Sequence, residues 1–291
     1  MITKPFVGNS HSLTQMDESN SSFSQQPNGK IFGAQTSHHE DDHRPLFPQL
    51  RIPPDFMPNG SKSLAKISEH AYGLGIVLGI CVVVAAQLVY AEHYLWRIPF
   101  FVAALAVFHY LEFEMTARYN PTDAKISSFL LFTNGRAYNI AHTAAITEAF
   151  LRYRLTQDGH FSLPFLPAFT ISVPLGIMLI VLGQTFRSLA MKQAGTSFNH
   201  IVQSSKKEDH VLITKGVYSV SRHPSYFGFF WWGLGTQVLL GNPICFAGYA
   251  AILWKFFAHR IMHEEKHLVD FFGRDYDSYR RSTPVLIPFI S

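Results

Sequence analysis

The sequence is poor in charged residues and in cysteine, and it has no large excess of basic residues. Only 15% of its 291 residues are charged, against roughly 25% in soluble domains, and 47% are hydrophobic, which argues against an ordinary soluble globular protein. The two cysteines, Cys81 and Cys245, lie in apolar runs, which excludes a disulfide framework. The formal net charge of +4 is too small to indicate nucleic-acid binding, which requires a clustered basic face.

The first 66 residues differ in composition from the rest of the chain. They contain seven of the sixteen prolines and several stretches rich in Ser, Asn and Gln, and no apolar periodicity runs through them. Such a segment buries too little apolar surface to offset the conformational entropy of the chain. We therefore expect a disordered polar tail over residues 1–66.

After residue 66, apolar blocks recur at lengths that suit a lipid bilayer, whose core takes about 20 residues of helix. The blocks with little or no charge are residues 71–91, 98–111, 137–151, 161–186 and 223–254. The last block is too long for one span and too short for two, and residues 241–243 read Gly-Asn-Pro. We therefore expect a tight helical hairpin there, with its second arm ending near residue 259. Residues 67–291 are predicted to be an all-α polytopic membrane domain with about six transmembrane helices.

The basic residues indicate how these spans are oriented. Eighteen Lys and Arg residues lie in the segments that six spans place on one side of the membrane, and only Arg97, Arg152 and Arg154 lie on the other. Basic residues accumulate in cytosolic loops. The pattern therefore predicts that both ends of the chain face the cytosol.

Polar residues that could carry chemistry collect in two predicted cytosolic segments, the loop 187–222 and the segment after residue 254. Arg260 and Glu264 are four residues apart and share one face of a helix, where they could orient a charged amphipathic substrate or form a simple stabilising ion pair. Residues 263–267 also match H-E-x-x-H, a zinc-protease pattern, although no recognised third ligand follows. A membrane zinc protease is thus an alternative.

Several motifs resemble those of isoprenylcysteine carboxyl methyltransferases. Residues 222–228 read Arg-His-Pro-Ser-Tyr-Phe-Gly and residues 264–265 are Glu-Glu, a combination that phospholipid methyltransferases share. The stretch 198–203, Phe-Asn-His-Ile-Val-Gln, and the turn 242–245, Asn-Pro-Ile-Cys, are specific to the prenylcysteine enzymes. The similarity runs from about residue 108 to residue 290 and is densest after residue 197. Among the members of this family, the chain most resembles the six-span fungal form.

The resemblance implies a reaction and a site. The family transfers a methyl group from S-adenosylmethionine to the C-terminal carboxylate of an S-prenylated cysteine, within a catalytic part at about residues 187–291. Arg260 matches the substrate-contacting arginine, and Arg187 is a second candidate. The cytosolic loop and the C-terminal helical segment would hold the cofactor through the residues that match the motif, which are Gln203, His210, Val211, Leu212, Ile213, Tyr218, His223, Pro224, Ser225, Tyr226 and Glu264. No metal ligand is implied.

The resemblance also implies partners and a location. Substrates would be prenylated CaaX proteins, such as Ras-type small GTPases, and lipidated peptides, presented at the bilayer of the endoplasmic reticulum. We expect the prenyl chain to enter sideways between spans, past aromatic residues among which Trp231 is the predicted substrate contact. A phospholipid N-methyltransferase, which shares the cofactor-binding motifs but methylates a head-group amine, is the main alternative.

Overall fold

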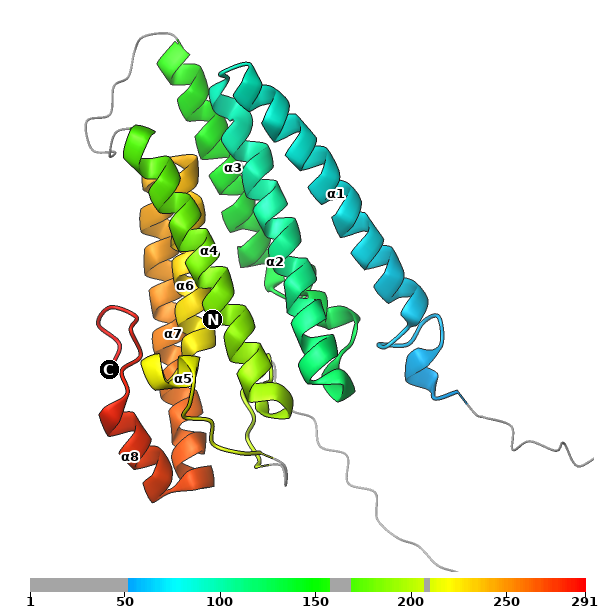
Figure 1. Cartoon of the computed structure of the whole chain (residues 1–291), viewed down its shortest axis with the longest axis vertical. Helices are drawn as coiled ribbons and strands as arrows, with labels where there is room; N and C mark the ends of the chain where they lie inside the picture. Colours follow the sequence, from blue (N-terminus) through cyan, green and yellow to red (C-terminus); the bar gives the residue numbers. More distant parts are fainter. Residues whose placement is uncertain (1–51, 158–168, 207–209) are drawn as a thin grey trace, which may run out of the picture. The chain divides into compact units, whose positions relative to one another are not determined.

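The computed structural model describes residues 52–157, 169–206 and 210–291, and these residues form helices and loops without a strand. Eight α-helices run in the order α1 (Leu64–Tyr90), α2 (Arg97–Tyr119), α3 (Gly135–Gln157), α4 (Phe169–Ala194), α5 (Val217–Val220), α6 (Pro224–Leu240), α7 (Pro243–Phe272) and α8 (Arg274–Ser282). A short 3-10 turn precedes α1 at Pro54–Phe56, and others lie between the helices at Tyr94–Trp96, Pro121–Asp123, Ile126–Phe129 and Gly195–Ser197. The all-helical prediction is confirmed for the described residues (Figure 1).

The last residues of the predicted tail belong to the first helix. Residues 1–51 lie outside the described residues, but α1 begins at Leu64, two residues before the predicted boundary. Ser63 ends the preceding turn and its hydroxyl accepts a hydrogen bond from the Lys66 N–H at 3.4 Å, as an N-cap does. The helix therefore starts at its capping residue, ahead of the apolar block.

Three described helical segments have the length and hydropathy of a membrane crossing: Leu64–Tyr90, Tyr94–Tyr119 and Ile171–Ser197. The other predicted spans are also helical, but α6 has only 17 residues, and α3 and α7 interleave charged side chains with apolar ones. α1 has a single buried residue, Ala85, whereas twelve of the 17 residues of α6 are buried. The apolar surface of α1 suits a lipid environment.

α6 and α7 form a hairpin whose turn falls where the sequence analysis placed it. α6 ends at Leu240, Gly241 has the left-handed backbone angle φ 73°, and Pro243 opens α7. A Cβ at Gly241 would lie only 3.0 Å from the Arg97 guanidinium, so glycine suits the turn for space as well as for backbone angle. The predicted end of the second arm near residue 259 does not end the helix. No helix-breaking residue occurs before Gly273, and α7 therefore continues to Phe272.

Glu148 of α3 anchors the start of α7. Its two carboxylate oxygens accept hydrogen bonds from the backbone N–H groups of Ile244 (2.9 Å) and Cys245 (2.7 Å). These amides have no partner within the helix and carry the positive end of its dipole, so a carboxylate there satisfies and stabilises the helix end. A charged residue within a predicted span is thus explained by a helix terminus.

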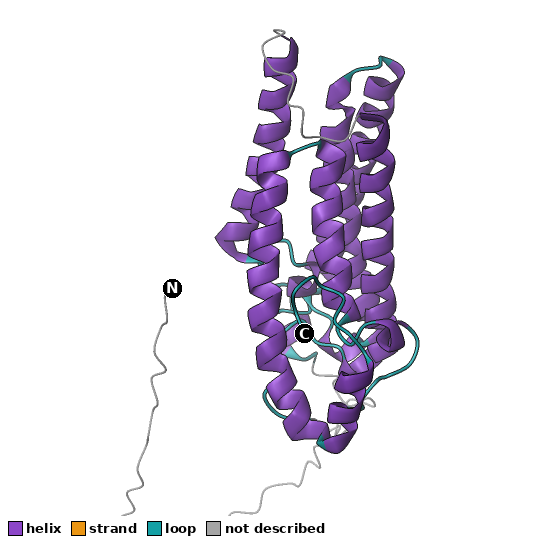
Figure 2. Cartoon of the chain, turned by 90° about the vertical axis from the view of Figure 1, so that its left-hand side faces the viewer, coloured by secondary structure: helices purple, strands orange, loops and turns teal. Residues whose placement is uncertain are grey.

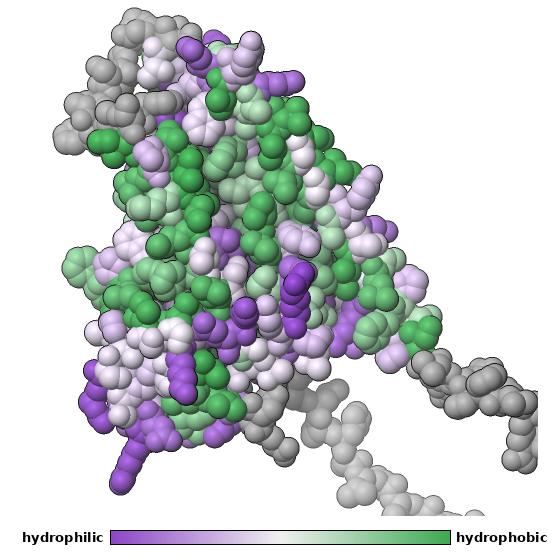
Figure 3. All heavy atoms as spheres, in the orientation of Figure 1, coloured by the Kyte–Doolittle hydropathy of each residue, from purple (hydrophilic) through white to green (hydrophobic). Residues whose placement is uncertain are grey.

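α4 and the first turns of α6 pack closely, with a glycine of each helix at the contact. A Cβ on Gly183 of α4 would lie 2.5 Å from the carbonyl oxygen of Gly228 in α6, and a Cβ on Gly228 would be as close to the carbonyl oxygen of Gly183. Glycine at both positions lets the two backbones approach. α5, α8 and the loops after α4 and before α6 gather at one end of the bundle (Figure 1), where Figure 2 shows the loops crowded together and hydrophilic side chains also collect (Figure 3).

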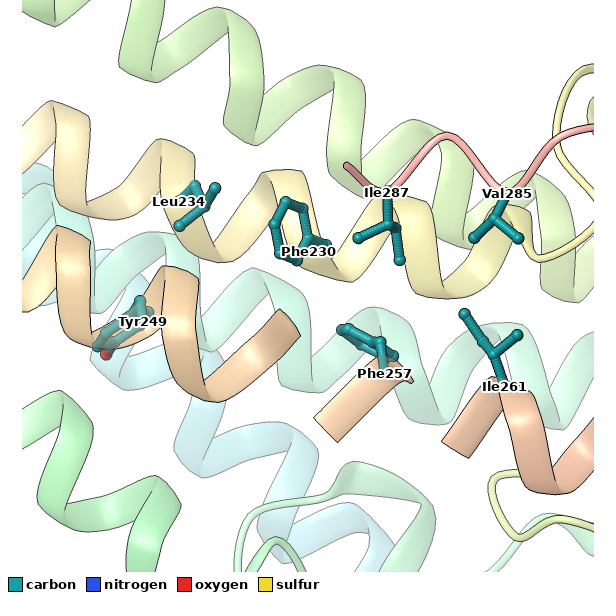
Figure 4. Packing of buried hydrophobic residues seen from close by; sticks show 7 residues of the cluster. All are labelled: Phe230, Leu234, Tyr249, Phe257, Ile261, Val285 and Ile287. Carbon is teal, nitrogen blue, oxygen red and sulfur yellow. The ribbon is translucent and has the colours of Figure 1, made fainter. Parts of the chain in front are cut away.

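The C-terminal segment closes the same end of the bundle. Val285 and Ile287 pack with Phe230 and Leu234 of α6 and with Phe257 and Ile261 of α7 in one apolar cluster (Figure 4). Ser221 and Arg222, just before α6, also donate to the carbonyl oxygens of Val285 (2.8 Å) and Pro284 (3.0 Å). The residues before α6 are therefore held from both sides.

Candidate functional site: two cavities with a shared wall

The first of two neighbouring cavities is mostly apolar and lies between α3, α6 and α7. It encloses about 290 Å³, against about 110 Å³ for its neighbour. Polar groups line the end of this cavity that lies toward α8. There the loop 198–200 meets Arg187, Ser225 and Arg260. The deeper part is lined by aromatic and aliphatic side chains, which include Phe229, Trp232, Tyr249, Ile252, Leu253, Phe256 and Phe257.

The second cavity brings together most of the predicted cofactor residues. It lies between the loop 210–213, α5, the start of α6, α7 and α8. Ten of the eleven predicted residues line it: His210, Val211, Leu212, Ile213, Tyr218, His223, Pro224, Ser225, Tyr226 and Glu264. Gln203 does not line it, and its side-chain amide donates to the carbonyl oxygen of Ile201 at 2.9 Å.

The two cavities share part of their walls. Phe198, Asn199, Ser225 and Tyr226 line both of them. Ser225 and Tyr226 are the second and third residues of α6, which Pro224 begins, while Phe198 and Asn199 follow the end of α4. A group bound in the apolar cavity therefore has a short path to one bound in the polar cavity.

Tyr226 connects a cation of the first cavity to an acid of the second. Its hydroxyl accepts a hydrogen bond from Nε of Arg260 at 2.8 Å and donates one to the Glu264 carboxylate. Arg260 and Glu264 do share a face of α7, but the tyrosine hydroxyl lies between them, and among the described residues Arg260 has no ion pair with an acid. Its Nη2 donates to the carbonyl oxygen of His200 at 2.5 Å. Arg260 therefore lies beside the shared wall without a direct ion pair, and its nearest acid, Glu264, is reached through the Tyr226 hydroxyl.

Arg187 is held very differently. Its guanidinium binds both carboxylate oxygens of Glu112 in α2, at 2.5 and 2.8 Å, and its Nη1 donates to the Ser225 hydroxyl at 2.7 Å. Nε2 of His200 lies 2.9 Å from the same carboxylate. Glu112 is fully buried and Arg187 is 7% exposed. The arginine charge is therefore neutralised. These hydrogen bonds and ion pairs join α2, α4, α6 and the loop that contains His200.

Glu265 supports the second cavity from behind. One of its oxygens lies 2.6 Å from Nε of Arg222 and 3.1 Å from Nε2 of His223, and Arg222 also donates to the carbonyl oxygen of Thr283. Burial alone would raise the pKa of this carboxyl group, but the hydrogen bonds and charges of His223 and Arg222 outweigh it and lower the pKa to about 2. The His223 ring, which stacks on Tyr226, is thereby held in place.

Trp231, the predicted substrate contact, lines neither cavity. Its ring packs against Phe227 and Phe230 of the same helix. Phe229 and Trp232 line the apolar cavity instead, because successive residues of a helix point about 100° apart. The aromatic run was recognised, but its cavity-facing members differ from the one chosen.

Other lining residues were missed by the sequence analysis. Leu268, Phe272, Tyr276 and Tyr279 complete the second cavity, and His142 and Tyr249 lie in the deep part of the first. The stretch 198–203 was a usable signal for Phe198 and Asn199, whereas His142 lies in a segment with no motif. In the part of the chain that the structure describes, no three His, Cys, Asp or Glu side chains lie together as metal ligands would.

Known proteins resemble the chain over the region that contains these site residues. The model of the isoprenylcysteine carboxyl methyltransferase (ICMT) family matches residues 176–270, which hold α6 and most of α7. The protein-S-isoprenylcysteine O-methyltransferase of Saccharomyces cerevisiae is 43% identical over 251 residues, covering 86% of this chain and 98% of the relative. The Homo sapiens enzyme of the same name is 37% identical over 225 residues, covering 77% and 75%.

A solved structure extends the likeness to the fold. It is described as the eukaryotic intramembrane Ras methyltransferase ICMT, and it superposes with a TM-score of 0.69 at 35% sequence identity, covering 77% of each chain. Sequence and fold therefore agree over most of both chains. This chain belongs to the isoprenylcysteine carboxyl methyltransferase family.

Proposed function

We propose that this chain methylates the C-terminal carboxylate of S-prenylated cysteine, with S-adenosylmethionine as methyl donor, at the wall that its two cavities share. The reaction and the donor are those of the family to which the chain belongs. The assignment of each substrate to a cavity is our inference from their linings. The apolar cavity suits a prenyl chain, and the smaller, more polar one suits the donor.

The residues of the second cavity fit the methyl donor. The Glu264 carboxylate suits the cationic amino group of its amino-acid part, and aromatic rings such as Tyr218 and Phe272 suit a cationic sulfonium or an adenine ring. When bound, the donor supplies an activated methyl group. The chain's own residues hold this donor against Tyr226, at the edge of the other cavity.

The methyl acceptor needs orientation and no general base. A C-terminal carboxylate has a pKa of about 3.3–3.7 and is therefore ionised at neutral pH. Catalysis then depends on holding it in line with the methyl group. We assign this role to Arg260, since no acid pairs with it directly and its Nη1 has no hydrogen-bond partner among the described residues. Arg187 is assigned to positioning, because Glu112 already neutralises it.

We infer that the prenyl chain enters from the membrane between α3 and α7. Ala137 of α3 and Ile252 and Phe256 of α7 line the apolar cavity, and all three are exposed. Apolar side chains that are exposed at a cavity rim suit entry of a lipid from the bilayer. This assignment replaces Trp231 as the expected lining of the entry.

We further propose the wider arrangement of the molecule. It has six membrane crossings, formed by α1, α2, α3, α4, α6 and the part of α7 up to about residue 259, in the endoplasmic reticulum membrane, and both termini lie in the cytosol. The membrane domain begins with α1 at residue 64 and extends to residue 291, its catalytic part is about residues 187–291, and the residues before α1 form a polar tail. The substrates are prenylated CaaX proteins such as Ras-type small GTPases. The distribution of basic residues supports this orientation.

The observation that carries this proposal is the bridge from Arg260 through Tyr226 to Glu264 across the shared wall. Membranes containing the chain would be given labelled S-adenosylmethionine and N-acetyl-S-farnesylcysteine, with Arg260→Ala and Glu264→Ala as variants and the exposed Arg281→Ala as a matched control. We expect a base-labile methyl ester from the wild type and the control, and little from the two variants. Label in phospholipid head groups instead, or full activity of Arg260→Ala, would contradict the proposal.

A further inference from the structure

A third cavity adjoins the apolar one at Arg260. It has a volume of about 540 Å³, and Phe256 and Arg260 line both it and the apolar cavity. The rest of its lining consists of Ile201, Val202, Lys255, His259 and His263. We call these seven residues the α7 groove. The apolar cavity, the second cavity beyond the Tyr226 hydroxyl and the α7 groove thus all adjoin the same arginine.

The α7 groove is lined by nitrogen bases and apolar side chains, and no acid lines it among the residues that the structure describes. Lys255, His259 and His263 are spaced four residues apart, so they follow one face of α7 over about 12 Å. All three are exposed. Glu264, the next residue of the helix, lines the second cavity instead. The α7 groove therefore offers N–H donors and a lysine charge to a ligand.

The proposed substrate brings three groups together at Arg260. The α-carbon of a C-terminal cysteine carries the thioether side chain, the carboxylate and the nitrogen that continues into the peptide chain. In the proposed function, the prenyl thioether lies in the apolar cavity and the carboxylate faces the second cavity. The peptide nitrogen and the residues before it then need a third path. The α7 groove starts at that point, because Phe256 and Arg260 belong to both linings.

The α7 groove also has a suitable position and length for a peptide. α7 continues beyond residue 259, where its proposed membrane crossing ends, so His263 lies on the cytosolic side. Lys255 lies about one turn inside the crossing, from where a lysine side chain reaches the interface. An extended chain advances about 3.3–3.6 Å per residue. The groove therefore has room for three to four residues of peptide along α7.

We propose that the α7 groove binds the three to four residues that precede the prenylated cysteine, and that Lys255 makes it favour acidic over basic residues there. This proposal rests on the proposed function. The imidazole N–H groups of His259 and His263 suit the carbonyl oxygens of any peptide backbone. The Lys255 ammonium attracts a carboxylate and repels an ammonium group. At an exposed position, such an interaction changes affinity by roughly twofold to fivefold.

The experiment compares substrates that differ only in the residues before the cysteine. The full-length chain in phosphatidylcholine vesicles would be given N-acetyl-S-farnesylcysteine and two S-farnesylated peptides, acetyl-Gly-Gly-Glu-Cys and acetyl-Gly-Gly-Lys-Cys. We expect the wild type to have a kcat/KM roughly twofold to fivefold higher for the Glu peptide. Lys255→Glu should invert this preference. Partition of the peptides into the vesicles cancels, because the same peptides are compared between variants.

Two further variants complete the design. Lys266→Glu is the matched control, because Lys266 is also an exposed lysine of α7 but lines a different cavity. It should keep the preference of the wild type. His259→Glu places a negative charge at a second position of the α7 groove and should shift the preference in the same direction as Lys255→Glu. The proposal therefore does not depend on one variant, and the thermal midpoint shows whether each is folded.

The outcomes separate this proposal from the function on which it rests. A shift toward the Lys peptide in Lys255→Glu and His259→Glu, absent in Lys266→Glu, supports the α7 groove. An unaltered preference in both groove variants would overturn it, while methylation of N-acetyl-S-farnesylcysteine leaves the proposed function standing. Equal losses for all three substrates would indicate a site for a lipid phosphate and also overturn the peptide groove. If the wild type methylates none of the three, the proposed function itself fails.

Discussion

Two arginines lie near the shared wall, and their surroundings differ. Arg187 is buried and forms a bidentate ion pair with Glu112, whereas Arg260 lies beside a tyrosine hydroxyl and a carbonyl oxygen with no acid paired to it. A buried arginine without a counter-charge would be very costly, so the Glu112 pair is a requirement of burial. An arginine at a cavity junction can instead leave its charge for a ligand. The difference separates an architectural cation from a substrate-binding one.

The largest effect is expected from breaking the buried pair. Glu112→Ala would leave the Arg187 charge buried without a partner, at a cost of about 3–5 kcal/mol, and should lower the thermal midpoint of the detergent-solubilised enzyme by roughly 10 °C. Glu112→Leu combined with Arg187→Met removes both charges and should restore much of the stability. A double variant as unstable as Glu112→Ala would contradict the assignment of an architectural pair.

Lysine substitution sharpens the comparison between the two arginines. Arg260→Lys keeps a charge at the shared wall but loses the planar donors, and we expect kcat/KM to fall by about 10–100-fold with an unchanged thermal midpoint. Arg187→Lys loses the bidentate pair with Glu112 and should lower the midpoint as well. If the two variants behaved alike in both measurements, the distinction drawn from their surroundings would be wrong.

Removing the hydroxyl between Arg260 and Glu264 tests the bridge itself. In Tyr226→Phe both charged groups lose one hydrogen bond while the ring keeps its packing. Hydrogen bonds to charged groups contribute about 1.5–3 kcal/mol, so kcat/KM should fall by roughly tenfold or more. Tyr218→Phe, a second-cavity tyrosine whose hydroxyl makes only a long contact of 3.4 Å to the carbonyl oxygen of Ala190, is the matched comparison and should lose less.

The smallest effect is expected from protonating Glu265, because its charge is lost only in acid and not at neutral pH. The pKa of Glu265 is lowered to about 2 in the folded chain, from an ordinary value of 4.5. Its contribution to stability is therefore complete above about pH 4.5 and is lost as the pH falls from there toward 2. The difference in thermal midpoint between the wild type and Glu265→Gln should shrink over this window. A difference that stays constant down to about pH 3 would show that Glu265 does not act through its charge.

Local signals in the sequence were enough for much of the site. The Arg-His-Pro-Ser-Tyr run and the later Glu264 lie on the start of α6 and on α7, and both line the second cavity. Proline at the first helical position and glycine after the last one mark the hairpin, because each residue restricts or permits particular backbone angles. Trp231 shows the limit, since composition identifies an aromatic helix but not which of its faces meets a cavity.

The partners of charged residues were decided by the tertiary structure. Glu112 and Glu148 are both acids within apolar segments, and nothing in their neighbouring sequence distinguishes them. One neutralises Arg187, 75 residues away, and the other accepts from the first amides of α7, 96 and 97 residues away. Such pairs form between helices that are distant in the chain, so their geometry depends on packing.

By itself, the sequence determined the helical membrane class, the hairpin turn and the family, since these follow from hydropathy, backbone restrictions and contiguous motifs. Only the tertiary structure decided that two cavities share a wall at Tyr226, that Arg187 and not Arg260 is paired directly with an acid there, and that His142 and Tyr249 lie in the deep part of the apolar cavity. These features each need side chains from separate helices at distances of a few ångströms. No pattern along a single helix carries that information.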